Sequence, residues 1–159
     1  MTQGMIEGGL QEAVASHGPS PKSLMQTSWK MFDATRVLLE SRQSVAEPTG
    51  LVAGMCLELA LKAYLLHSNV SEDTLRDHVS HDLFEAWHRC IAHGLPLTNP
   101  PEWVELLQAG YWRGDRNAKK AGYLFRYSRD MNGIVLPPQT TLLTGLRQVL
   151  EAVQRVAAL

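Results

Sequence analysis

The chain has 159 residues and a mass of 17.7 kDa, which is the size of a single domain. Apolar residues make up 45% of the sequence and charged residues 19%, a balance that is typical of a globular fold and excludes a disordered chain. The 15 Lys and Arg residues nearly cancel the 16 Asp and Glu residues, so the formal charge of −1 excludes a histone-like or polybasic protein. Any nucleic-acid site must therefore be local.

The hydropathy pattern predicts neither a membrane span nor a secretory signal. The longest apolar stretch, residues 51–66, is interrupted by Glu58 and Lys62, and the N-terminal residues lack a basic and apolar leader. Two cysteines, Cys56 and Cys90, are too few for a disulfide framework. We therefore expect a cytoplasmic protein with no membrane association.

Residues 1–20 are rich in glycine and poor in large apolar groups, which predicts a flexible N-terminal arm before one domain at residues 21–159. Ser20 can cap a helix and Pro21 suits the first helical position, so a helix is predicted from Pro21 to about Ala46. Its large apolar residues recur at the spacing of one helix face: Met25, Trp29, Phe32 and Leu39.

A second helix is predicted at residues 49–68, after a break at Pro48 and Gly50. It is apolar on almost every side, which is typical of a helix at the centre of a bundle. Glu58 and Lys62 lie four residues apart, in the order that favours a salt bridge. We expect this pair to brace the bundle and, if it is buried, to tolerate the loss of one partner poorly.

A third helix follows a polar connection at residues 68–81. Asp82 and Glu85 have the spacing of a capping box, which predicts a helix over residues 82–93. Gly94 is then placed to end it, as glycine does after many helices.

Two more helices complete the predicted fold. Asn99 as a cap and Pro100 as the first helical residue predict the start of a fourth helix, with helical apolar spacing from Trp103 to Tyr111. Residues 138–158 have the cleanest amphipathic pattern of the chain. Because no hairpin of strands stands out, the predicted fold class is all-α, an up-and-down helical bundle of four to five helices.

The stretch at residues 114–137 lacks a clear helical pattern, and such a stretch in a compact domain is often functional. From Arg113 to Arg129 the chain carries a local charge of +5, with Asp115 as the one opposing carboxylate. The aromatic residues that alternate with these cations are Tyr111, Trp112, Tyr123, Phe125 and Tyr127. Cations hold phosphates and aromatic faces stack on bases, so we predict a nucleic-acid or nucleotide site. Its candidate residues are Arg113, Arg116, Lys119, Lys120, Tyr123, Arg126, Tyr127 and Arg129. The alternative is a solvated loop whose aromatic residues face the core.

Other titratable clusters carry weaker signals. The histidines at positions 78, 81, 88 and 93 include one Glu-x-x-His, half of a di-iron motif, but no second copy exists. We therefore predict no metal and no cofactor. The acidic stretch is expected to be a solvated face, with pairing to the basic segment as the alternative: Glu72, Asp73, Asp77, Asp82 and Glu85.

The apolar helix at residues 55–66, with its acid-then-lysine pair, is similar to the second helix of HEPN domains (higher eukaryotes and prokaryotes nucleotide-binding). The His-Asp-Leu at residues 81–83 resembles the His-Asp-Leu that opens the next helix in that family. The resemblance covers residues 22–158 and implies a bundle of four or five helices, usually dimeric, that acts on or near RNA or nucleotides.

Many HEPN members are metal-independent ribonucleases, marked by an arginine, often followed by asparagine, and a histidine four to six residues beyond. The resemblance implies that the arginine steadies the phosphate and the histidine helps to activate the ribose 2′-hydroxyl. Here Arg116 and Asn117 supply the opening pair, but no histidine follows, which argues against the usual nuclease. Arg76 and His81 have four residues between them but precede the predicted third helix, so we interpret their spacing as coincidental. The Arg-Tyr at residues 126–127 is similar to one in HEPN members that accompany nucleotidyltransferases.

The sequence thus predicts a HEPN-like, non-catalytic module that binds RNA or a nucleotide, as a homodimer, with a nucleotidyltransferase-type protein as a further partner. One alternative is a metal-independent endoribonuclease of the toxin–antitoxin type. Its catalytic residues would be Arg76 with His81, or Arg116 with an unidentified base. The other alternative is a structural protein–protein interaction domain.

Overall fold

A computed structural model describes residues 18–41, 46–112 and 135–159 of the chain. Within these ranges every regular element is helical and none is a strand, which confirms the predicted all-α class. Most of the predicted N-terminal arm and of the stretch at 114–137 lies outside the described residues.

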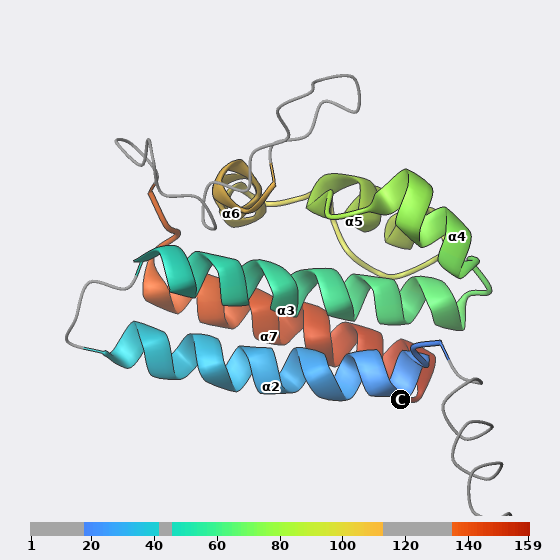
Figure 1. Ribbon diagram of the computed structural model, residues 1–159, viewed down its shortest axis with the longest axis horizontal. Helices are drawn as coiled ribbons and strands as arrows, with labels where there is room; N and C mark the ends of the chain where they lie inside the picture. The colour runs from blue at the N-terminus through green and yellow to red at the C-terminus, as the bar shows by residue number, and fades with distance from the viewer. Residues whose placement is uncertain (1–17, 42–45, 113–134) are drawn as a thin grey trace, which may run out of the picture.

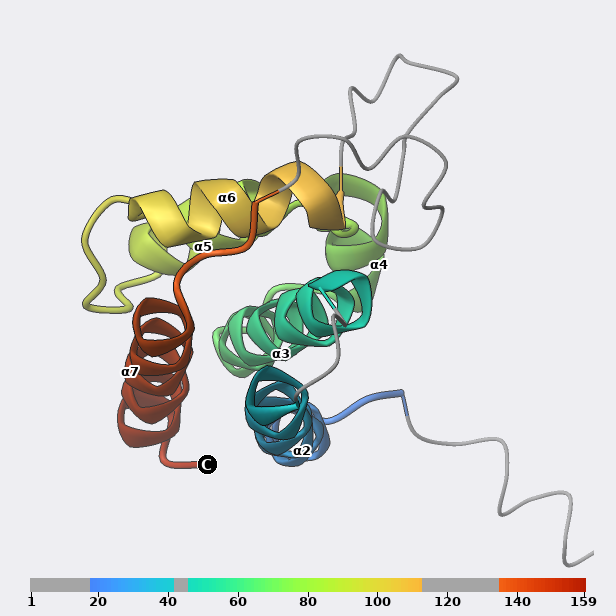
Figure 2. The same cartoon turned by 90° about the vertical axis from the view of Figure 1, so that its left-hand side faces the viewer.

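Three long helices lie side by side (Figure 1). They are α2 (Pro21–Glu40), α3 (Ala46–His67) and α7 (Gln139–Ala157). α2 runs antiparallel to the other two, and α5 (Leu83–Ala92) and α6 (Glu102–Tyr111) cover α3 on the side away from α2 (Figure 2). The last helix therefore returns to the first two and closes the core.

α3 is the centre of the fold, as its apolar pattern predicts. It contacts α2, α5, α6 and α7, and its residues Leu57, Leu61 and Leu65 are fully buried. By length and composition α3 is apolar enough to cross a membrane, and 67% of its most apolar window is buried inside the fold. A helix that is covered on all sides needs no polar face, which explains this composition.

The boundary between the first two helices differs from the prediction. α2 ends at Glu40 rather than near Ala46, and α3 already begins at Ala46. Pro48 and Gly50 therefore lie inside α3 instead of preceding it. Pro48 is tolerated because it lies in the first helical turn, where a backbone N–H has no helical acceptor.

The proline pattern also predicts a start for α6 that is too early in the chain. α6 begins at Glu102 with Pro101 as its cap residue, rather than at Pro100 with Asn99 as the cap. A residue that precedes a proline disfavours helical dihedral angles, and this keeps Pro100 outside the helix.

The predicted caps of α2 and α5 are present, with one difference. Ser20 caps α2 through its side chain, and the Asp82 side chain accepts a hydrogen bond from the backbone N–H of Glu85 at 3.0 Å. In a full capping box the Glu85 side chain would also bond the backbone N–H of Asp82. The Glu85 carboxylate instead accepts a hydrogen bond from Arg89 Nε at 2.6 Å, so only half of the predicted capping box forms. Gly94 has a φ of 95° and ends α5, as predicted.

The polar connection between α3 and α5 is more ordered than the sequence suggests. It contains the short helix α4 (Glu72–Thr74) and a π-helical turn, η1 (Leu75–Val79). Ser80 then has a φ of 50° and a ψ of −118°, a conformation that is rare for residues other than glycine. π-helical turns and positive φ values both occur often at functional sites, so this connection is a place to look for one.

Candidate functional site

Four polar side chains from three parts of the chain meet at one carboxylate, and we call them the Glu58 cluster: Glu58, Lys62, His81 and Tyr111. Lys62 Nζ donates to Glu58 Oε1 at 2.6 Å, and the Tyr111 hydroxyl donates to Oε2. His81 Nδ1 lies 3.0 Å from Glu58 Oε2. The Glu58 side chain is only 8% exposed. The predicted Glu58–Lys62 pair is thus present and buried, and it has two partners that the spacing in α3 does not indicate.

The Glu58 carboxylate is ionised in this setting. Burial is the largest single influence on its pKa and acts to raise it. The hydrogen bond from His81, the charge and hydrogen bond of Lys62, and the hydrogen bond from Tyr111 act in the opposite direction. Together they lower the pKa of Glu58 below its ordinary value of 4.5. Since an ionised carboxylate only accepts hydrogen bonds, Nδ1 of His81 carries the proton in this contact.

Local features of the chain bring these side chains together. Glu58 and Lys62 are one turn apart on α3, and the Ser80 turn places His81 directly before α5. The Tyr111 ring packs on α3 at Gly54, where a Cβ atom would lie 2.1 Å from Tyr111 Cδ2. The glycine one turn before Glu58 therefore makes room for the tyrosine that binds this carboxylate.

A surface cleft of about 390 Å³ opens beside the cluster. Its lining residues are Pro19, Leu24, Glu58, Leu59, Lys62, Leu66, Glu72, Leu75, Arg76, Ser80 and His81. Arg76 and His81, whose spacing we interpreted from the sequence as coincidental, line this one cleft together with Glu58 and Lys62. The fold thus brings the acid-then-lysine pair and the Arg-x4-His pair to a single site.

The cations at this cleft are already matched by carboxylates. Arg76 donates to Asp77 Oδ1 at 2.9 Å and lies 2.9 Å from Asp73 Oδ1, with 69% of its side chain exposed. Lys62 is held by Glu58. Asp73 and Asp77 of the acidic stretch have 79% and 54% of their side chains exposed, as expected for a solvated face, and both pair with Arg76 at the cleft.

The predicted phosphate-binding residues, from Arg113 to Arg129, all lie outside the described residues. The two aromatic residues that precede them are described, and they correct part of the aromatic series. Tyr111 is 4% exposed and Trp112 is 8% exposed, so both pack in the core and neither presents a ring for stacking on a base. Because Tyr111 binds Glu58, the described range 46–112 ends one residue after a member of the Glu58 cluster.

Two other chemistries can be judged from the described ranges. There, no three His, Cys, Asp or Glu side chains gather as a metal site. Cys56 and Cys90 are buried, and burial raises the pKa of the Cys56 thiol to about 12 and raises that of Cys90 as well. Buried thiols with raised pKa values are poor nucleophiles, so neither cysteine is suited to be a catalytic thiol.

Sequence reasoning named Glu58, Lys62, Arg76 and His81 but did not place them in one site, and it missed Tyr111 as a partner of Glu58. The only advance signal for Tyr111 was its position at the end of a predicted helix, which does not indicate a distant carboxylate. Comparison with models of protein families, with curated proteins and with solved structures finds no match to this chain.

Proposed function

We propose that this chain is a cytoplasmic, homodimeric, HEPN-like module that binds nucleic acid or a nucleotide without cleaving it. The cleft beside the Glu58 cluster would hold a phosphate group, and the basic segment at residues 113–129 would extend the contact. The four-to-five-helix up-and-down bundle of the family and a nucleotidyltransferase-type partner belong to the same proposal.

The observation that carries this proposal is the lining of the cleft. Three side chains that can bear positive charge, Lys62, Arg76 and His81, line a volume of about 390 Å³ together with the carboxylates of Glu58 and Glu72. This volume is within the size range of small-molecule sites. The chain leaves the described region at Trp112, beside the same cluster, and the residues that follow carry a charge of +5. A single ligand would place one phosphate in the cleft and further phosphates along the basic segment.

The carboxylates around Arg76 do not prevent phosphate binding. Arg76 is 69% exposed, and its partners Asp73 and Asp77 have 79% and 54% of their side chains exposed. Ion pairs between exposed side chains are weak because water screens the charges, so a phosphate can replace them at small cost. Lys62 remains in place because the buried Glu58 holds it.

Binding of a fluorescent single-stranded RNA, measured by polarisation across a salt series, tests the basic segment. The double variant Lys119→Glu/Lys120→Glu should bind more weakly. The slope of log K against log salt is negative, and its magnitude should be smaller by about 1.4 in this variant. Lys22→Glu/Lys30→Glu makes the same charge change on exposed positions of α2 and is the matched control. Equal losses in the two double variants, or no RNA binding by the wild type at low salt, would contradict the proposal.

The cleft is tested separately with Arg76→Gln. This variant should weaken RNA or nucleotide binding several-fold, while Arg36→Gln, which breaks a surface pair with Glu40, should leave it unchanged. Unchanged binding by Arg76→Gln would remove the cleft from the site. Salt-insensitive binding of a protein, with no RNA retained at low salt, would favour the structural interaction domain instead.

One observation favours a second function, a metal-independent endoribonuclease. Glu58 holds Nδ1 of His81 at 3.0 Å, and a carboxylate in this position orients an imidazole as a general base. The His81 side chain is 41% exposed and lines the cleft with Arg76. In this reading the imidazole takes the proton of the ribose 2′-hydroxyl, and Arg76 steadies the phosphate. The 2′-oxygen attacks the phosphorus and the bond from phosphorus to the 5′-oxygen breaks, which leaves a 2′,3′-cyclic phosphate. The protonated imidazole then gives its proton to the departing 5′-oxygen.

Incubation with end-labelled RNA in the presence of a chelator separates the two functions. For a nuclease, His81→Ala should abolish cleavage, and His88→Ala, at an exposed position on α5, should retain it. Binding without cleavage by the wild type supports the non-catalytic module. Cleavage that persists in His81→Ala would show that this histidine is not the base.

A further inference from the structure

The cleft beside the Glu58 cluster has an apolar surface as well as charged groups. Four leucine side chains line it, and we call them the apolar floor: Leu24 of α2, Leu59 and Leu66 of α3, and Leu75 of η1. Leu75 is 6% exposed and the other three are partly buried. A phosphate alone would leave this floor uncovered, whereas a ligand that also carries a flat ring would cover it.

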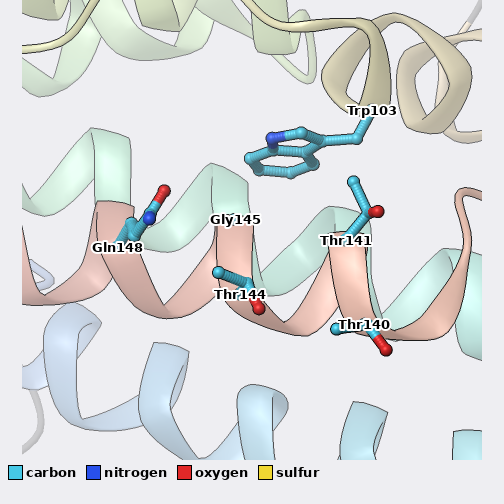
Figure 3. Close-up of a pocket in the computed structure, with 6 residues that line it drawn as sticks. All are labelled: Trp103, Thr140, Thr141, Thr144, Gly145 and Gln148. Atoms are coloured by element: carbon cyan, nitrogen blue, oxygen red, sulfur yellow. The ribbon is translucent and has the colours of Figure 1, made fainter.

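The combination of charge and hydrocarbon distinguishes this cleft from another hollow of the described surface. That hollow, of about 350 Å³, lies between Trp103 of α6 and the helix α7 (Figure 3). None of the residues that line it carries a charge. A ligand with both a phosphate and a ring therefore fits the cleft beside the Glu58 cluster better than this hollow.

One charged group that lines the cleft has no protein partner within the described ranges, and it is the carboxylate of Glu72. The Glu58 carboxylate binds Lys62 and His81, and Arg76 is matched by its neighbouring aspartates. At neutral pH a carboxylate accepts hydrogen bonds from a ligand and donates none. Glu72 therefore offers the ligand two acceptor oxygens that no described protein donor occupies.

Glu72 lies at the opposite end of the cleft from the Glu58 cluster. Its carboxylate lies over Gly18, where an added Cβ atom would overlap with it. Ser28 Oγ of α2 donates to the Cys56 carbonyl of α3 at 2.7 Å, and the two helices are antiparallel (Figure 1). Gly18, ten residues before Ser28, is therefore level with the last turn of α3. Glu58 lies about two turns before that level, roughly 10 Å along the helix axis.

We propose that the ligand of this cleft, under the nucleotide-binding function proposed above, is a guanine nucleotide. Its phosphate lies at Arg76 and the basic side chains of the Glu58 cluster, its base lies on the apolar floor, and the Watson–Crick edge of the base reaches Glu72. On this edge guanine presents two adjacent donors, N1–H and the N2 amino group, which match the two oxygens of one carboxylate. The other common bases have one donor group there, beside an acceptor that a carboxylate repels.

Calorimetric titration of the full-length protein with GMP, IMP and AMP tests this assignment. IMP has the structure of GMP without the N2 amino group and is the matched control ligand. We expect GMP to bind about tenfold more tightly than IMP or AMP, which is within the range of one bidentate base contact. Glu72→Gln should remove this advantage, because the amide replaces one acceptor oxygen with a donor. Glu151→Gln, the same change at an exposed position of α7, should retain it.

Arg76→Gln separates the choice of base from the binding of phosphate. This variant should weaken the binding of GMP, IMP and AMP alike, because the three ligands share the phosphate. Equal binding of the three by the wild type, with the Arg76 effect intact, would overturn the guanine assignment and leave the phosphate site standing. A guanine preference that persists in Glu72→Gln would overturn the role of Glu72. No binding of any of the three up to about 10 mM would overturn the cleft as a nucleotide site and the guanine assignment with it.

Discussion

The sharpest consequence of the structure concerns the carboxylate at the centre of the Glu58 cluster. Glu58→Gln keeps the shape of the side chain and one acceptor oxygen but removes the charge. Lys62, with 16% of its side chain exposed, then keeps its positive charge without the carboxylate that neutralises it. Removing one partner of a buried ion pair costs about 3–5 kcal/mol, and the partial exposure of Lys62 favours the lower end, about 3 kcal/mol.

Thermal and urea unfolding, followed by circular dichroism, measure this loss. For a domain of this size 1 kcal/mol moves the Tm by about 2–4 °C, so Glu58→Gln should unfold roughly 6–12 °C below the wild type. Glu40→Gln is the matched control, since its pair with Arg36 has side chains 55% and 44% exposed. That control should stay within about 0.5 kcal/mol of the wild type. Equal Tm changes in the two variants would refute the reasoning from burial.

The stability difference between the wild type and Glu58→Gln depends on pH in a direction that the structure predicts. Folding lowers the pKa of Glu58 below 4.5, so the contribution of its charge to stability is complete above that pH. This contribution is lost as the pH falls from the ordinary pKa to the folded-state pKa, because over that range the unfolded chain takes up a proton at Glu58 and the folded protein does not. The stability difference between wild type and Glu58→Gln should therefore be constant near neutrality and shrink below about pH 4.5. A difference that stays constant down to about pH 3 would show that the carboxylate charge is not its source.

Three further outcomes can be checked independently. Gly54→Ala places a Cβ atom 2.1 Å from the Tyr111 ring, so urea unfolding should show a loss of about 1–3 kcal/mol; an unchanged midpoint would mean that the ring moves freely. Ser80→Gly removes the cost of a φ of 50° and should raise the free energy of unfolding by about 1 kcal/mol, whereas a destabilised variant would contradict the strain. Cys56 and Cys90 should remain unreactive to DTNB at about pH 8 until the protein is unfolded, because burial raises both thiol pKa values; rapid labelling of the native protein would contradict their burial.

The elements of this fold that were predictable depend on interactions between residues close in the chain. Helix periodicity, the cap at Ser20, the glycine stop at Gly94 and the Glu58–Lys62 pair all act over one or two turns. The errors at Pro48 and at Pro100 have a local cause too, since a proline is accepted within the first turn and disfavours helix in the residue before it.

The site itself depends on packing between residues that are distant in sequence. Glu58 binds His81 and Tyr111, which are 23 and 53 positions further along the chain, and no spacing rule connects them. The same holds for Trp103, whose ring packs against α7 at the place where Gly145 leaves room for it. A hydrophobic pattern specifies which face of a helix is buried, but the partner across the core is chosen by the volumes and hydrogen bonds of all the helices together. For this reason the sequence alone predicts the Glu58–Lys62 pair. Only the tertiary structure places this pair beside His81 and Arg76 at one cleft.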